Sequence, residues 1–178
     1  MTATRIRRCA ADLGLFLAHA VELEAEAAAR YDELADSLEA HNNPEVARLF
    51  RELAGHGRSH RDQVAGIAAA HGPLPKVAPW DFDWGGAAES PEAPTFEDVH
   101  YLMTPHHALA LALRCETRAR DYYAAVAEET DQPGIARLAR SFAEEEESHV
   151  ALVRQWLDRF PPPPPGWDED PDPPNYNE

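Results

Sequence analysis

Apolar residues recur at alternating spacings of three and four residues in four long stretches of the chain. The first stretch runs from about residue 4 to residue 40, and the second from residue 44 to residue 71. The third begins at Thr104-Pro105, and the fourth runs from residue 133 to about residue 159. This spacing places the apolar side chains on one face of an α-helix. The pattern therefore predicts four long amphipathic helices, as in a helical bundle.

Turns and breakers separate these helices. Pro44 and Pro133 each follow a short polar turn and suit the first position of a helix, and Asn43 can cap the helix that Pro44 begins. Residues 72–104 contain prolines and aromatic residues without sustained helical periodicity, so they predict a long crossover and not a tight hairpin. We therefore expect an all-α four-helix bundle of two helix pairs joined by this crossover.

The bundle is expected to span residues 1–160. Five prolines at 161–165 end the fourth helix. The remaining tail to residue 178 is acidic and Pro-rich, with too few apolar residues to fold alone, and is expected to be disordered.

Ionisable residues interrupt the apolar seam of the fourth helix. Between Phe142 and Val153 the seam positions fall on Glu146 and His149, one helical turn apart. Burial of such groups is costly unless each finds a partner. The pattern therefore indicates a Glu-x-x-His half-site for a metal inside the bundle. The other glutamates of this run lie off the seam and are interpreted as a solvated acidic patch: Glu144, Glu145 and Glu147.

The same chemistry occurs in both halves of the chain. Glu24 and Glu116 occupy seam positions on the first and third helices, and a tyrosine, Tyr31 or Tyr123, follows each after seven residues. On the second and fourth helices, the quartets V-A-R-L and I-A-R-L each precede a seam histidine, His60 or His149, at the same distance. This internal duplication predicts one site at which all four helices converge.

The doubled pattern resembles the rubrerythrin branch of the ferritin-like superfamily, which uses Glu-x-x-Ala-x-x-x-Tyr and Glu-x-x-His twice around a di-iron centre. The resemblance covers roughly residues 13–67 and 105–156. It implies an up-down helix pair, a crossover and a second pair, with the metals between the four helices. The ligands that it implies are two terminal carboxylates, two imidazoles and one bridging carboxylate: Glu24 and Glu116, His60 and His149, and Glu146.

The sequence departs from that family pattern in two places. Gly57 occupies the position of a second bridging carboxylate, and the cysteine-rich rubredoxin module is absent. Two divalent ions with three carboxylates would keep a net positive charge, which favours a bound hydroxide, oxide or other anion in the space that Gly57 leaves. His56, one turn before His60, is a candidate substitute ligand; the alternative is a polar residue on the flank of the helix.

Three occupancies of the site stay open. The first is an asymmetric five-ligand site for two metals, the second is one metal on Glu116, Glu146 and His149, and the third is a metal-free polar core. Mixed carboxylate and imidazole ligands suit iron, with two ions per bundle favoured, but manganese or zinc would also fit. Tyr31 and Tyr123 are interpreted as packing residues whose hydroxyls bond to neighbouring ligands, with a redox role as the alternative.

The composition of the chain excludes several classes of protein. The formal net charge of -16 argues against a nucleic-acid binder, which would need a basic patch. Two cysteines, Cys9 and Cys115, exclude a disulfide scaffold and a Cys-x-x-Cys site, and suit the cytoplasm as a reducing compartment. No run of 18 apolar residues exists, so we expect no membrane span.

Three functions follow as hypotheses. The first is a non-haem iron oxidoreductase of the peroxidase or ferroxidase type, acting on oxygen or peroxide. The second is an iron-handling or storage protein without turnover, which the acidic surface and the missing electron module favour. The third is a bundle scaffold whose tail, with Trp167 and Tyr176, docks a partner. A homodimer is expected from the resemblance alone.

Overall fold

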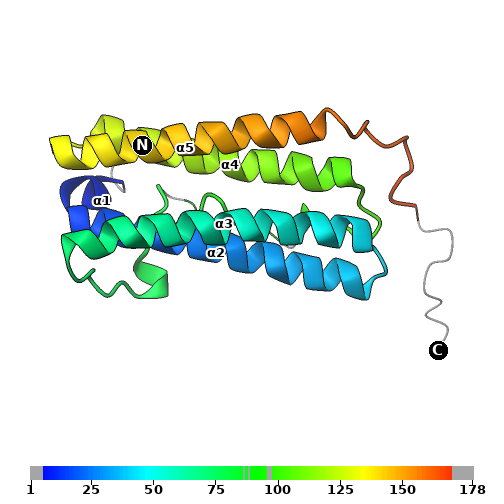
Figure 1. Ribbon diagram of the computed structural model, residues 1–178, viewed down its shortest axis with the longest axis horizontal. Helices are drawn as coiled ribbons and strands as arrows, with labels where there is room; N and C mark the ends of the chain where they lie inside the picture. The colour runs from blue at the N-terminus through cyan, green and yellow to red at the C-terminus, as the bar shows by residue number, and fades with distance from the viewer. Residues whose placement is uncertain (1–5, 86, 88, 96–97, 170–178) are drawn as a thin grey trace.

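The computed structural model describes residues 6–85, 87, 89–95 and 98–169. Four long helices form a bundle, and a short helix and a 3-10 turn accompany them (Figure 1). Within the described ranges the chain has no β-strand, which confirms the predicted all-α four-helix bundle. The elements in chain order are α1 (Arg7–Ala11), α2 (Leu13–Ala40), α3 (Pro44–His71), η1 (Pro79–Asp81), α4 (Pro105–Glu129) and α5 (Pro133–Leu157).

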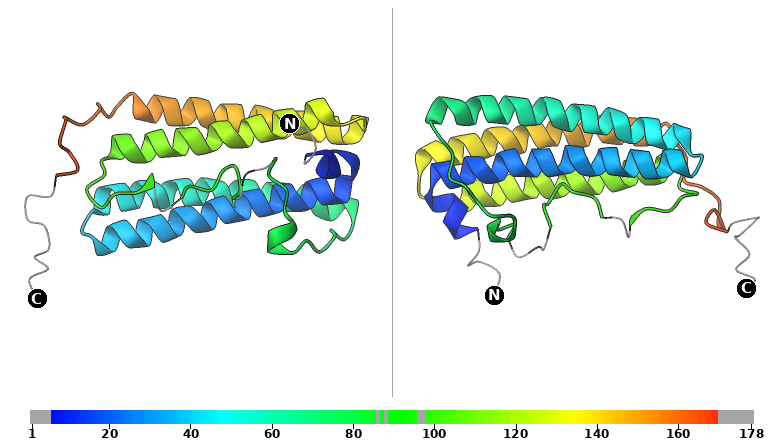
Figure 2. Two further views of the ribbon diagram at one scale, coloured as in Figure 1. Left: turned by 180° about the vertical axis from the view of Figure 1, so that it is seen from behind. Right: turned by 90° about the horizontal axis from the view of Figure 1, so that it is seen from below.

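The long helices form two antiparallel pairs, α2 with α3 and α4 with α5. The crossover leaves the end of α3 at one end of the bundle and reaches the beginning of α4 at the other (Figures 1 and 2). It contacts both pairs on the way. The ring Nε2 of His19 on α2 accepts from the backbone N–H of Asp83 at 3.0 Å, and Arg118 on α4 donates to the carbonyl of Pro91.

The first predicted helix is not continuous, and this part of the prediction is wrong. Asp12 has an extended backbone, with φ -137° and ψ 116°, which separates α1 from α2. Its side chain accepts a hydrogen bond from the N–H of Leu15 at 2.9 Å. Aspartate is a strong N-cap because it satisfies a backbone donor that the first helical turn leaves free. Asp12 therefore begins a new helix instead of continuing the old one.

The predicted helix starts at Pro44 and Pro133 are confirmed. Asn43 precedes Pro44, but its side chain makes no capping hydrogen bond. The Asn43 amide instead donates to the carbonyls of Met103 at 2.7 Å and Tyr101 at 3.2 Å. The turn between α2 and α3 is thereby tied to the end of the crossover, at the point where α4 begins.

The core consists of two hydrophobic clusters with a polar layer between them. One cluster gathers around Phe16, Tyr123 and Phe142, and the other around Tyr31 and Phe50. Each fully buried large apolar side chain contributes roughly 1.5–3 kcal/mol of hydrophobic free energy. The two clusters therefore hold the helices together at both ends of the polar layer and shield that layer from solvent.

Part of the acidic tail contacts the bundle. Trp167 is partly buried, and its ring centroid lies 3.8 Å from that of His107 on α4. Residues 170–178, including Tyr176, lie outside the described residues. None of the helices that the structure describes is both long and apolar enough to cross a membrane.

Candidate metal centre

Glu24 supplies the first carboxylate of the polar layer, from the middle of α2. Its side chain is fully buried, as its position on the seam predicts. The hydroxyl of Tyr123, on α4, donates to Glu24 Oε1 at 3.1 Å. This bond fixes one carboxylate oxygen and leaves the other, Oε2, directed toward α3 and α5.

His60 on α3 lies against that second oxygen. Its Nδ1 is 3.1 Å from Glu24 Oε2 and 3.2 Å from Glu146 Oε1. The other ring nitrogen, Nε2, lies 2.8 Å from Glu145 Oε2. A proton on Nε2 that is donated to Glu145 leaves the lone pair of Nδ1 directed into the site, which is the tautomer that a metal ligand needs.

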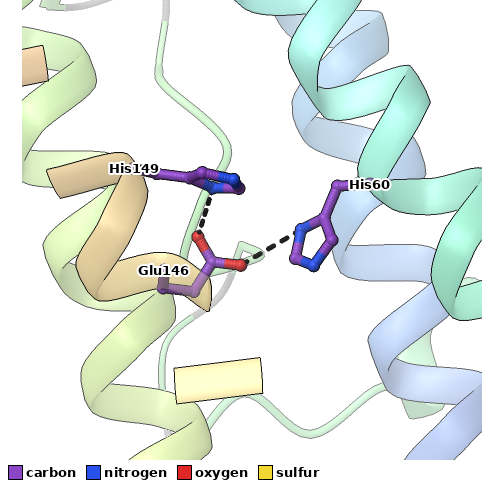
Figure 3. Close-up of side chains that lie close together, drawn as sticks. All are labelled: His60, Glu146 and His149. Carbon is purple, nitrogen blue, oxygen red and sulfur yellow. Dashed lines mark hydrogen bonds and ion pairs between the residues drawn. The ribbon is translucent and has the colours of Figure 1, made fainter. Parts of the chain in front are cut away.

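Glu146 and His149 complete the half-site predicted on α5 (Figure 3). His149 Nδ1 lies 3.1 Å from Glu146 Oε2 and 3.4 Å from Glu116 Oε2 on α4. The two oxygens of Glu146 therefore face different histidines, His149 on its own helix and His60 across the bundle. Side chains from all four long helices meet at this carboxylate, as the internal repeat predicts.

A fourth buried carboxylate, Glu92, enters the layer from the crossover. It is only 3 % exposed. Ligand atoms of Glu24, Glu92 and Glu146 all lie within 4.8 Å of one another, and the same holds for His60, Glu146 and His149. A cation about 2.1 Å from each of its ligands fits within groups of this size. Glu146 belongs to both groups, so it is placed between two potential ion positions.

Five ligand atoms in the layer lack a hydrogen bond of good geometry among the described residues, although four of them lie within ion-pair distance of a neighbour in the layer. Nearly all buried polar atoms in proteins are hydrogen-bonded, so this set of atoms is consistent with a site for a cation. Oxygen and imidazole donors are what iron, manganese and zinc bind, so the side chains present fit divalent cations. The five atoms are Glu24 Oε2, His60 Nδ1, Glu92 Oε2, Glu116 Oε2 and Glu146 Oε1.

The electrostatics of the layer favour positive charge at its centre. Burial lowers the pKa of His60, but Glu146 and Glu24 outweigh burial and raise that pKa to about 11. Glu116 and Glu146 raise the pKa of His149 to about 10. Burial raises the pKa of Glu116 to about 7. The pKa of Glu146 would also rise on burial, but His149 and His60 lower it to about 2. Both imidazoles are therefore protonated at neutral pH when no metal is bound, and a metal ion would have to replace the proton on the inward nitrogen of each.

Gly57 lies where α2 and α3 approach closely. A Cβ atom on Gly57 would meet the Cβ of Ala28 at 3.3 Å and the Ala28 backbone at 3.5 Å. A larger side chain at this position would push the two helices apart. The missing second carboxylate of α3 is therefore explained by packing, and Glu92 brings a carboxylate to the same layer from the crossover.

His56 and Tyr31 are not brought into contact with the converging ligand atoms. His56 is exposed on α3, and its ring lies 5.9 Å, centroid to centroid, from that of Trp156. The Tyr31 hydroxyl is buried beside the thiol of Cys115 and makes no hydrogen bond with a described carboxylate of the layer. The two tyrosines of the repeat therefore differ, because the Tyr123 hydroxyl does bond to a carboxylate of the layer.

Sequence reasoning missed two of the residues at this site. Glu92 stands in a proline-bracketed segment without periodicity, so no pattern marked it as inward. Glu145 lies off the apolar seam, and its interpretation as part of a solvated patch is incomplete, because its carboxylate contacts His60 and also accepts from Gln63. The approach of a neighbouring helix provides that partner, and spacing along one helix does not report it.

Comparison with known proteins agrees with this geometry. The rubrerythrin family model matches residues 16–80 and 107–165, which contain most of each helix pair. The chain is also similar to an uncharacterized conserved protein from Magnetospirillum magnetotacticum MS-1 whose crystal structure is known. The two share 41% sequence identity over 86% of this chain and 98% of that chain, with a TM-score of 0.65. Comparison with curated proteins gave no match.

Proposed function

The chain belongs to the rubrerythrin family, and from that premise we propose that it binds two divalent metal ions, preferably iron, and reduces peroxide or dioxygen with them. The observation that supports this most is the convergence of buried carboxylates and imidazoles from separate helices on one interior point. A divalent cation at that point would contact several of these ligand atoms at once and would offset the cost of burying so many acidic groups together.

The ligands would divide between two ion positions. Glu24 and His60 would hold one ion, since Glu24 Oε2 and His60 Nδ1 lie 3.1 Å apart. Glu116 and His149 would hold the other, since Glu116 Oε2 and His149 Nδ1 lie 3.4 Å apart. Glu146 would bridge the two ions, because each of its oxygens faces one of the histidines.

Neighbouring side chains hold these ligands in orientation. The Tyr123 hydroxyl holds Glu24, and Glu145 holds the ring of His60 through its outer nitrogen. Such partners fix the position and the tautomer of a metal ligand before the metal arrives. When bound, two ferrous ions would supply the two electrons that, together with two protons from solvent, reduce one hydrogen peroxide to two waters.

A small cavity connects the ligands with the surface between α3 and α5. It reaches Glu116 and His149 on its inner side, and Trp156 and His56 near the surface. Its volume of about 20 Å³ is enough for roughly one water-sized molecule. The cavity gives a small molecule a path toward Glu116 and His149.

Metal analysis tests the proposal directly. Protein purified without added metal, stripped with a chelator and titrated anaerobically with ferrous iron should bind close to two ions per chain. The E146Q variant should lose the greater part of that binding, because the substitution removes the one charged carboxylate that both positions share. E144Q is the matched control, since Glu144 is exposed on the same helix. E146Q protein that kept two ions with unchanged affinity would overturn the proposal.

Iron handling without turnover is the second candidate function. The chain has two cysteines in total, Cys9 and Cys115, and thus no four-cysteine module to deliver electrons. Diferrous protein given excess peroxide and a chemical reductant separates the two functions. Repeated consumption of peroxide supports the oxidoreductase. One stoichiometric round, after which the ferric iron is retained, supports iron handling.

A further inference from the structure

We propose that Glu92 is a metal ligand delivered by the crossover, and that Arg118 is the positioning residue that holds it in the site. The inference rests on the proposed function, because a ligand requires an ion. It adds a sixth ligand from a segment outside the two Glu-and-His helix pairs.

The placement of Glu92 is the first support. The side chain is 3 % exposed, and its Oε2 has no hydrogen-bond partner among the residues that the structure describes. It shares a group of close ligand atoms with Glu24 and Glu146. A carboxylate buried beside two others is strongly unfavourable unless a cation joins them. Burial and then the charge of Glu24 raise the pKa of Glu92 well above its usual value, which agrees with that cost.

The backbone around Glu92 is the second support. Arg118 Nε donates to the carbonyl of Pro91 at 2.8 Å, and the guanidinium also donates to the carbonyl of Ala93 at 3.2 Å. These two carbonyls flank Glu92, so one side chain of α4 clamps the segment on both sides of the ligand. Arg118 lies two residues after Glu116 on α4, so the same helical turn carries one ligand and holds another in place.

The segment at residues 90–94 is buried, unlike an ordinary surface loop. Ser90, Pro91, Ala93 and Pro94 are all buried, although the crossover on either side of them is largely exposed or half-buried. Loops usually run over the surface because buried backbone leaves polar groups unsatisfied. Here the Arg118 guanidinium satisfies two of the buried carbonyls. The proline rings at 91 and 94 also restrict the backbone, which lowers the entropy lost when the segment is fixed.

Charge balance is the third support. With Glu24, Glu116 and Glu146 alone, two divalent ions would keep a positive charge in a core of low dielectric. A fourth carboxylate neutralises the pair. Glu92 therefore provides the negative charge that we expected, from the sequence, to come from a bound anion in the space beside Gly57.

The E92Q variant tests the role of the ligand, with E89Q as its matched control. Glu89 lies three residues earlier on the same crossover and is exposed, so both variants remove one negative charge from the same segment. Each metal-free protein is titrated anaerobically with ferrous iron in competition with a chromophoric chelator, which gives the affinity of each ion. Thermal unfolding of the metal-free proteins reports any loss of folding.

E92Q should lower the affinity for one of the two ions by at least about tenfold. Loss of a residue that only orients a metal ligand already lowers metal affinity roughly 10–100-fold. The affinity of E92Q for the second ion should not change, and E89Q should bind both ions with the affinities of the wild type. Metal-free E92Q should melt no lower than wild type, since the substitution removes repulsion between buried carboxyl groups. E92Q that binds both ions as E89Q does would overturn the inference. Wild-type protein that binds no metal would overturn the proposed function instead.

The R118Q variant tests the positioning role of Arg118 separately. It also tests whether the crossover supports metal binding if E92Q does not fold. It leaves all ligands in the chain but removes the clamp on the Pro91 and Ala93 carbonyls. It should weaken the same ion as E92Q, by a smaller factor. A merely structural arginine would lower the melting temperature of the metal-free protein and leave both affinities unchanged, and that result would refute the positioning role.

Discussion

The two helix pairs carry the same motif, yet they build their shares of the site differently. In the second pair, α5 provides both a carboxylate and an imidazole, Glu146 and His149. In the first pair, α3 provides only His60, because Gly57 stands one turn earlier where the second pair has Glu146. The first pair is also the more enclosed, since His60 is 5 % exposed and His149 31 % exposed.

The difference shows how a duplicated bundle can lose a ligand on one side and still keep the charge of its site. Close packing of Gly57 on Ala28 means that a side chain on α3 at this position would require α2 to shift. The carboxylate enters from a segment that has no counterpart in the repeat. The site is then asymmetric in its ligands, although the small cavity borders both sides, since Gly57, Glu92 and His149 all line it.

The largest effect is expected as the difference in stability between alanine substitutions at two glycines of α3, Gly57 and Gly55. G57A should lower the free energy of unfolding by about 1 kcal/mol, because an overpacking cost of roughly 1–3 kcal/mol exceeds the helix-propensity gain of up to ~1 kcal/mol. Gly55 on the same helix has nothing within 4 Å of its added Cβ, so G55A should stabilise by about 0.5–1 kcal/mol. Chemical denaturation of the two variants measures the difference. Equal stability would show that the close approach does not explain the missing carboxylate.

The next largest effect is expected on iron affinity when the two tyrosines of the repeat are substituted. Y123F removes the hydroxyl that donates to Glu24 and should weaken one ion about tenfold. Y31F removes a hydroxyl that lies beside the Cys115 thiol and not against a described ligand, so iron affinity should not change. Competitive iron titration of both variants measures this asymmetry. Equal losses would mean that both tyrosines support ligands, as a symmetric repeat would require.

Substitution of Glu145 should have the smallest effect on iron affinity. E145Q keeps an acceptor for His60 Nε2 but removes the charge that strengthens the hydrogen bond, so affinity for one ion should fall about threefold. E147Q is the matched control, because Glu147 is exposed and pairs with Arg120. The same titration distinguishes the two. If E147Q weakened iron binding as much as E145Q, the acidic surface as a whole, and not the contact with His60, would be responsible.

Much of this arrangement could be predicted from spacing alone. Helical periodicity reports which side of a helix is buried, so it placed Glu24, His60, Glu116 and Glu146 on inward faces. Their appearance in a repeat predicted that they would meet, and the structure brings them within ion-pair distance of their neighbours.

The remainder depends on tertiary contacts that periodicity does not report. The path of the crossover is set by the bonds of Arg118 to two backbone carbonyls, so the inward position of Glu92 was not visible in the sequence. The break at Asp12 depends on whether one side chain caps or continues a helix, and both were compatible with the apolar pattern.

A crystal structure of the protein loaded with ferrous iron, with anomalous-scattering data at the iron edge, would show whether the metal centre exists. We expect two anomalous peaks on either side of Glu146, one within coordination distance of Glu24, His60 and Glu92, and the other near Glu116 and His149. A map without peaks between the helix pairs would contradict the metal centre. Two peaks with Glu92 turned away from both would contradict the role of the crossover.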